Sequence, residues 1–231
     1  MKPYGAALRA FHAGRHDAGI RLRSSLGEDE IVPAAIFFRE NDDLFWFELQ
    51  AFEMARGTVL DLGAGAGPHA LELQRRGFDV LAVENCAPLV EIMRERGVRH
   101  AIRRDFRWWR GPTFETVLML MNGVGPTATV AGLDRFLAHA RGLLAQGGQL
   151  LVDSAEAVPE GRPGGEEGWP AAGGYPGQAW IDLEFDGDRG LPFRELYADA
   201  DTLRDRAERA GWATEVAAEA DGAFLLRLTL R

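Results

Sequence analysis

Apolar runs and helix-like stretches alternate along most of the chain, beginning at Thr58. Thr58–Leu62 is a short β-branched and apolar run of the kind that forms a buried parallel strand. It stops at a G-x-G-x-G turn, and Pro68 then stands at a position that suits the first turn of a helix. Gly77 follows where that helix would end in a left-handed residue. The pattern therefore predicts a buried strand, a glycine turn and a helix.

The same alternation continues to about residue 152. The run at 114–121 is the most apolar of all, which favours a central place in a sheet. The predicted strands are 58–62, 78–83, 98–102, 114–121 and 149–152, and the predicted helices lie between Pro68 and Gly77, at 88–96 and at 133–144. Strands that alternate with helices in this way predict an α/β domain with a parallel sheet.

Beyond residue 178 the pattern becomes antiparallel. Residues 179–185 alternate apolar and polar side chains, and a turn at 186–188 leads to 193–197, which predicts an added hairpin. A short helix at 201–210 precedes two strands at 212–218 and 223–230. These strands are joined through Asp221-Gly222, a strong hairpin turn.

Two segments lie outside the α/β alternation. Residues 1–56 are predicted to be mostly helical and to form a cap segment, which leaves 57–231 as the main domain. Residues 155–178 hold seven glycines and four prolines in 24 positions, and a loop of that length is usually either functional or disordered. The predicted insertion is the loop together with the hairpin after it, 155–198. The loop leaves from the carboxyl end of a strand, so it either closes over a substrate or is a flexible insertion without function.

Composition narrows the classes of partner. The chain has 26 basic and 35 acidic residues, a net charge of −9, which repels nucleic acid because few basic residues are clustered. One cysteine permits no internal disulfide, and no run approaches the roughly 20 apolar residues of a membrane helix. The expected protein is soluble and cytoplasmic, without a membrane partner. His12 and His16 lack a third ligand type, so no metal site is predicted, and composition does not predict the oligomeric state.

The glycine turn is the most informative stretch. Glycine has no Cβ, so the backbone can turn tightly and lie against a ligand, while free backbone N–H groups and the helix dipole suit an anionic group. Two ligands compete, a dinucleotide and S-adenosylmethionine. The dinucleotide fingerprint G-x-G-x-x-G requires glycine at position 68, where this chain has proline. Asp61 followed by Gly63, Gly65 and Gly67 instead resembles the first motif of the class I S-adenosylmethionine-dependent methyltransferases.

This resemblance covers about residues 57–231 and implies a fold. The family has a Rossmann-like, seven-stranded, mostly parallel sheet with helices on both faces and a terminal antiparallel hairpin, and the strands predicted at 212–218 and 223–230 match that hairpin. The N-terminal segment and the hairpin added after the fifth strand are then additions to the family core. The N-terminal segment and the glycine- and proline-rich loop are the parts expected to select the substrate.

The resemblance also implies residues that hold S-adenosylmethionine and its product, S-adenosylhomocysteine. Glu84 ends the second strand, where the family has an acidic residue that accepts hydrogen bonds from both ribose hydroxyls. Asp105 and Phe106 match an adenine-binding pair after the third strand, although Asp105 could equally pair with a neighbouring arginine. His69 is expected beside the cofactor carboxylate. The complete predicted set is Asp61, Gly63, Ala64, Gly65, Gly67, His69, Glu84, Asn85, Asp105, Phe106 and Met121.

The end of the fourth strand is expected to meet the substrate, because the family places the transferable methyl group there. Asn122 is the predicted catalytic residue: it would bind a substrate amine or hydroxyl or the methionine part of the cofactor, or else it only forms a turn. Phe38, Arg39 and Tyr175 are further candidates for substrate contact. Members that methylate nucleic-acid amino groups have Pro-Pro and an aromatic residue after this position, whereas this chain has Gly-Val-Gly.

Three functions follow from these residues. The first is methyl transfer to a small molecule by in-line displacement, which needs alignment and exclusion of water but no general base. The second is methylation of a protein or RNA, which a basic or extended groove beside the methyl site would favour. The third is a non-catalytic module that binds S-adenosylmethionine, with its acceptor pocket filled by side chains.

Overall fold

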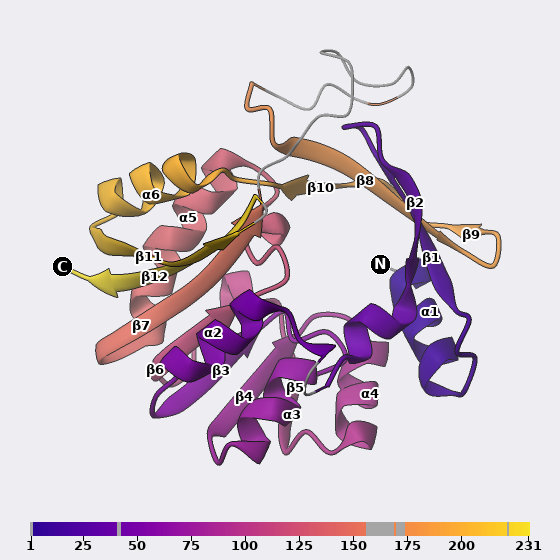
Figure 1. Cartoon of the computed structure of the whole chain (residues 1–231), viewed down its shortest axis with the longest axis horizontal. Coiled ribbons are helices and arrows are strands. Elements are labelled where there is room, and N and C mark those ends of the chain that lie inside the picture. The colour runs from indigo at the N-terminus through magenta and orange to yellow at the C-terminus, as the bar shows by residue number, and fades with distance from the viewer. Residues whose placement is uncertain (1, 41–42, 156–168, 170–173, 221) are drawn as a thin grey trace.

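The computed structural model describes residues 2–40, 43–155, 169, 174–220 and 222–231. Two sheets organise the chain (Figure 1). The larger one has seven strands and carries the glycine turn, and the smaller one joins the N-terminal segment to the hairpin that follows residue 178. Within the described residues, no helix is both long and apolar enough to cross a membrane.

The larger sheet confirms the predicted fold class. Its order is β11-β12-β7-β6-β3-β4-β5, and only β12 runs against its neighbours. The strands are β3 (Thr58–Leu62), β4 (Asp79–Glu84), β5 (His100–Arg103), β6 (Phe114–Met119), β7 (Leu144–Ala155), β11 (Trp212–Ala220) and β12 (Ala223–Leu230). β3 lies between β4 and β6, so the carboxyl ends of these three parallel strands meet at one edge.

Helices cover both faces of this sheet. The apolar side chains of α5 (Val130–Ala140) and α6 (Ala200–Arg209) fill one core with the inner strands. Those of α2 (Trp46–Met54), α3 (Pro68–Arg75) and α4 (Ala87–Arg96) fill the core on the opposite face. Short 3-10 turns complete the connections: η1 (Ala34–Phe38), η3 (Phe106–Trp108), η4 (Gly125–Thr127) and η5 (Arg141–Leu143).

The smaller sheet corrects the prediction that residues 1–56 are mostly helical. After α1 (Lys2–His12), the chain forms β1 (Gly19–Ser24) and β2 (Asp29–Pro33) before reaching α2. β1 pairs antiparallel with β8 (Gln178–Phe185), which also pairs with β9 (Asp188–Arg189) and β10 (Phe193–Leu196). The predicted hairpin is therefore present, and the N-terminal strands extend it into one sheet.

A third apolar cluster joins the smaller sheet to the larger one. Ala7 and Leu8 of α1 pack between Ile181 of β8 and Leu89 of α4, and Ala66 of the glycine turn belongs to the same cluster. Because α1 contacts both β8 and α4, the smaller sheet lies over the segment that follows β3 and β4 (Figure 1). Most of the predicted glycine- and proline-rich loop, 156–168 and 170–173, lies outside the described residues.

Candidate active site

The glycine turn after β3 is shaped by left-handed backbone at Gly63, Gly65 and Gly67, with φ of 75°, 55° and 86°. At Gly67 a Cβ would approach side-chain atoms of Met93 and Val98 to 2.9 Å, so glycine is needed for packing as well as for φ. At Gly63 a Cβ would meet nothing within 4 Å. The turn is therefore tight on the α4 side and open at its first glycine.

The expectation of free backbone N–H groups in this turn is wrong for the four predicted positions. The N–H groups of Gly63 and Ala64 donate to the Val83 carbonyl at 2.9 and 3.1 Å. Gly67 donates to the Ala64 carbonyl and Gly65 to the Glu84 carboxylate. These bonds hold the turn in shape without a ligand, so it acts as a preformed cradle.

Glu84 ends β4 beside this cradle and is 8% exposed. Its carboxylate accepts hydrogen bonds from the backbone N–H groups of Gly65 (3.1 Å), Asn85 (2.7 Å) and Cys86 (2.8 Å). Burial raises the pKa of Glu84, and the three N–H bonds oppose that rise. A carboxylate has about four lone-pair sites, so Glu84 retains capacity to accept a further hydrogen bond.

Behind the cradle lies a buried chain of alternating charges, Arg39, Glu48, His69 and Asp61. Glu48 accepts hydrogen bonds from Arg39 Nη2 (2.6 Å) and His69 Nε2 (2.7 Å), and His69 Nδ1 lies 3.8 Å from Asp61 Oδ1. Burial alone would lower the pKa of His69, but the bonds and charges of Asp61 and Glu48 raise it to about 10. His69 is thus a buried imidazolium. The Glu48 carboxylate that binds it also binds Arg39 of the cap segment.

Asp61 keeps one carboxylate oxygen free in this chain. Asp61 is 1% exposed, and its Oδ2 has no hydrogen-bond partner among the described residues. A buried carboxylate oxygen without a partner is costly unless a ligand donor reaches it. Its place on β3, two residues before Gly63, puts it at the cradle.

The turn after β6 brings the predicted catalytic residue to the same edge of the sheet. Met121 and Asn122 both have left-handed φ, 69° and 53°, which is strained for side chains of this size. Asp153 at the end of β7 holds the turn, because it accepts the N–H groups of Asn122 (3.1 Å) and Gly123 (2.8 Å). The Asn122 Nδ2 group is buried and has no partner among the described residues.

The structure favours the ion-pair alternative for Asp105. Its carboxylate forms a two-point contact with the Arg107 guanidinium, at 2.9 and 2.6 Å, and also accepts the Arg107 backbone N–H. The Arg107 hydrogen bonds hold the pKa of Asp105 below its usual range. Phe106 packs edge-on against Phe136 of α5, with 5.6 Å between ring centroids. Adenine binding by Asp105 and Phe106 stays a prediction to which these contacts add no support.

The three residues predicted to contact substrate lie in different places. Arg39 is in the buried charge chain, and its Nη2 is 3.1 Å from Met121 Sδ, next to Asn122. The Phe38 ring packs on Phe11 and lies 5.0 Å from the Arg96 guanidinium, which makes it a contact between α1 and α4. Tyr175 bonds to Asp199, the N-cap of α6.

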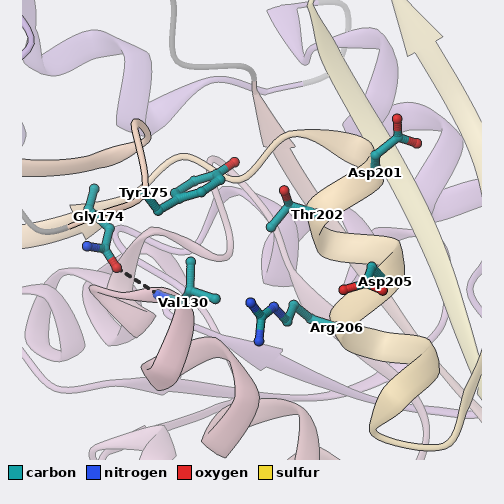
Figure 2. A pocket seen from close by; sticks show the side chains of 8 residues that line it. Val130, Gly174, Tyr175, Asp201, Thr202, Asp205 and Arg206 are labelled. Carbon is teal, nitrogen blue, oxygen red and sulfur yellow. Dashed lines mark hydrogen bonds between the residues drawn. The ribbon is translucent and has the colours of Figure 1, made fainter. Parts of the chain in front are cut away.

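Tyr175 also lines a hollow of about 590 Å³ that is separate from the cofactor elements. The hollow lies between the start of α5, the segment 174–178 and the exposed face of α6 (Figure 2). Its lining residues are Val130, Gly174, Tyr175, Gln178, Asp201, Thr202, Asp205 and Arg206. None of them belongs to the glycine turn or to the turn after β6. Tyr175 is thus not brought together with Asn122.

Three residues of this site are not among those predicted from the sequence. Glu48 sits in the first turn of α2, where a carboxylate within an aromatic run was the available signal. Asp153 lies two residues before the end of β7, the strand that pairs with β6, and its position near a strand end was the available signal. Tyr4 of α1 has its hydroxyl 3.8 Å from the point where a Gly65 Cβ would be. No local pattern indicated that contact.

Comparison with known proteins identifies this geometry. The structure superposes on that of an S-adenosylmethionine-dependent methyltransferase from Bacteroides fragilis in complex with S-adenosyl-L-homocysteine, with a TM-score of 0.87. The two chains are 32% identical, and the match covers 99% of this chain and 94% of the other. The chain belongs to the class I S-adenosylmethionine-dependent methyltransferases. S-adenosylmethionine is therefore the cofactor of this methyltransferase, and S-adenosylhomocysteine is its product.

More distant matches agree on the fold of the methyltransferase. CcbJ from Streptomyces caelestis, also a methyltransferase, has a TM-score of 0.60 at 19% identity, over 80% of this chain and 94% of the other. The chain matches no family model. Among curated proteins, an ATP synthase lysine N-methyltransferase of Caenorhabditis elegans is 35% identical over 63 residues. That match spans 27% of this chain and about a third of the relative's length.

Proposed function

We propose that this methyltransferase acts on a small-molecule acceptor. The observation that supports it is the smaller sheet, which the chain builds over its own cofactor edge. At Gly5 of α1, a Cβ would be 3.0 Å from Cys86 Sγ and 3.3 Å from Pro88 Cγ, so α1 lies directly on the start of α4 after Glu84. A site roofed this closely by its own chain suits an acceptor of small size.

The residues at the cradle fit S-adenosylmethionine. Glu84 retains capacity to accept a hydrogen bond from a ribose hydroxyl, Asp61 Oδ2 is a buried acceptor for an ammonium group, and Asn122 Nδ2 is a buried donor. When bound, the cofactor supplies a methyl group activated by the positive charge on sulfur. The chain contributes alignment and a dry environment, and alignment alone supplies up to about 7–11 kcal/mol of rate enhancement in favourable cases.

Charge counts against a nucleic-acid acceptor. The net charge of −9 disfavours a polyanion, and the arginines of the segment 103–110 are partly taken up in contacts such as that of Arg107 with Asp105. A protein lysine is the second candidate acceptor, because of the partial match to a lysine N-methyltransferase. A small-molecule acceptor and a protein acceptor are distinguished by which of the two carries the transferred methyl group after the reaction.

The test begins with the cofactor. Calorimetric titration of the protein with S-adenosylmethionine is expected to show micromolar binding, weakened at least tenfold in Glu84→Ala because the ribose hydroxyls lose a charged acceptor. Glu219→Ala, on exposed β11, is the matched control and is expected to bind as the unaltered protein does. Equal affinity in Glu84→Ala would contradict the ribose assignment.

The acceptor class is then measured by transfer of labelled methyl groups. A cell extract is divided by ultrafiltration into a small-molecule fraction and a protein fraction, and each is incubated with the enzyme and methyl-labelled S-adenosylmethionine. Label is expected in the small-molecule fraction. Label confined to the protein fraction would refute the small-molecule proposal and support the second candidate.

A further inference from the structure

Glu195 of β10 is a carboxylate on the face of the smaller sheet that looks toward the cofactor edge. It lies opposite Ala179 of β8, and its neighbours on the same face, Phe193 and Tyr197, pack on the apolar cluster that contains Ala66 of the glycine turn. Residues two apart on a strand share a face. Glu195 is half-buried among these neighbours, and a charge partly withdrawn from water costs free energy unless a partner compensates it.

Gly125 lies between Glu195 and the predicted catalytic residue. β10 packs against η4, which begins at Gly125. A Cβ at Gly125 would be 2.7 Å from Asn122 Nδ2 and 3.6 Å from the Glu195 carboxyl carbon. The Asn122 amide and the Glu195 carboxyl group therefore border the same point, although they come from different sheets.

The surroundings of Glu195 are acidic or aromatic. Its hydrogen-bond partner is the Tyr197 hydroxyl, which donates to Oε2 at 3.4 Å, and no basic side chain of the described residues lies within ion-pair distance. Glu28, in the turn between β1 and β2, adds negative charge, and Tyr4 of α1 lies in the fields of both Glu84 and Glu195. Tyr4 packs edge-on against Phe37, with 5.1 Å between ring centroids.

We propose that the acceptor is a small-molecule amine and that Glu195 binds its ammonium form and takes a proton from it. A carboxylate that lies near aromatic rings and forms no ion pair within the described residues suits a cationic ligand. This inference rests on the proposed function and assigns the acceptor side of the same site.

Glu195 prepares the acceptor for attack by changing its protonation. An ammonium nitrogen has no lone pair, so one proton moves from nitrogen to the Glu195 carboxylate, and the neutral amine attacks. The nitrogen–methyl bond forms as the carbon–sulfur bond breaks with its electron pair staying on sulfur. The methylated amine leaves with its own positive charge, and the proton on Glu195 passes to water.

The titration of Glu195 suits this role. Burial raises the pKa of Glu195 to about 7, helped by the charge of Glu28 and opposed by the hydrogen bond from Tyr197. A general base is most effective when its pKa lies near the working pH. Since only the ionised form attracts an ammonium group, binding of a cationic amine should weaken as the pH falls below about 7.

The experiment measures binding to the full chain saturated with S-adenosylhomocysteine. Calorimetry compares aliphatic, aromatic and sugar amines with their hydroxyl counterparts. At least one amine is expected to bind tenfold or more tightly than its alcohol, and about tenfold more weakly at pH 6 than at pH 8. Glu195→Gln is expected to lose at least tenfold in amine affinity and all of this pH dependence, with unchanged affinity for S-adenosylhomocysteine.

Controls separate the proposal from a folding defect and from the proposed function. Glu184→Gln lies on β8 in the same sheet, pairs with Arg23, and should bind amines as the unaltered protein does. If Glu195→Gln does not fold, Glu195→Asp keeps the charge and should retain the pH dependence. Absence of S-adenosylhomocysteine binding would refute the proposed function itself. Binding of S-adenosylhomocysteine with no amine binding, or amine binding unchanged in Glu195→Gln, would refute the role of Glu195 alone.

Discussion

Replacing Glu48 by glutamine tests the buried charge chain that joins the cap segment to the cofactor edge. Glu48 is fully buried and accepts three hydrogen bonds, from Arg39 (2.6 Å), His69 (2.7 Å) and the Phe45 backbone N–H (2.6 Å). Burial would raise the pKa of Glu48, but the bonds from His69 and Arg39 outweigh it and lower the pKa. Glutamine keeps the shape but leaves two buried cations without their shared anion.

The magnitude follows from His69. Its ordinary pKa of 6.5 is raised to about 10 in the fold by Asp61 and Glu48 together. A difference of that size corresponds to about 5 kcal/mol in favour of the protonated imidazole. Since Glu48 supplies part of it, and breaking a buried ion pair costs about 3–5 kcal/mol, we expect Glu48→Gln to lower the free energy of unfolding by about 3–4 kcal/mol at pH 7.

The pH dependence has a definite sign. Because the pKa of His69 is higher in the folded state, its contribution to stability is fully present below about pH 6.5 and is lost as the pH rises through about 10. The free energy of unfolding should therefore fall between pH 7 and pH 10 in the unaltered protein, and fall less in Glu48→Gln. Urea titrations followed by tryptophan fluorescence at several pH values measure both quantities.

Glu53→Gln is the matched control, because Glu53 lies on the same helix in an exposed pair with Arg76. An exposed ion pair contributes about 0–1 kcal/mol, so this variant should change stability little. If Glu48→Gln were no less stable than Glu53→Gln, or if stability did not change from pH 7 to pH 10, the buried charge chain would not act as described.

Two further substitutions test the cradle and the strained turn. Gly67→Ala combines a left-handed φ with a 2.9 Å approach to Met93, so it should lower the free energy of unfolding by about 2–4 kcal/mol. Gly77→Ala, with a similar φ but open space around the Cβ, should lower it by only about 1–2 kcal/mol. Urea titrations measure both values, and equal losses would refute the packing argument. Asp153→Ala removes the acceptor of two backbone N–H groups in the turn after β6 and should cost about 2–4 kcal/mol. Burial raises the pKa of Asp153 to about 6, so the stabilisation from its protonation is present below about pH 4 and lost as the pH rises through 6. The stability difference between the two proteins should thus be larger at pH 4.5 than at pH 8, and a difference independent of pH would contradict this assignment.

The larger sheet could be predicted from the sequence because its signals are local. Most of its parallel strands are apolar runs bounded by glycine or a helix. β5 (His100–Arg103) is not apolar throughout and could be predicted from its place in the alternation of strands and helices. Glu84 and Asn122 could be placed at one edge for the same reason, since carboxyl ends of parallel strands meet there. Their individual contacts with the cofactor stay predictions.

The smaller sheet could not be predicted because its pairing is remote. Arg21 of β1 lies opposite Glu184 of β8, more than 160 positions along the chain. β1 has six residues and carries Arg21 and Arg23 two positions apart, so neither end of the chain shows by itself that it needs the other. For the same reason the sequence does not indicate that Tyr4 lies near Gly65, nor that Glu195 and Asn122 both lie near Gly125.

The pairing of β8 with β1 and β10 links the position of Glu195 to the N-terminal segment. Glu195 is held on β10, which pairs with β8, while β8 is held by β1, and α1 packs beneath them on α4. A substitution in the N-terminal segment that moves β1 therefore also moves the strand that carries Glu195. The proposed role of Glu195 makes specificity for the acceptor depend on β1 as well as on the hairpin after residue 178. Exchanging that hairpin alone with that of another methyltransferase should leave cofactor binding in place but misplace Glu195 relative to Asn122.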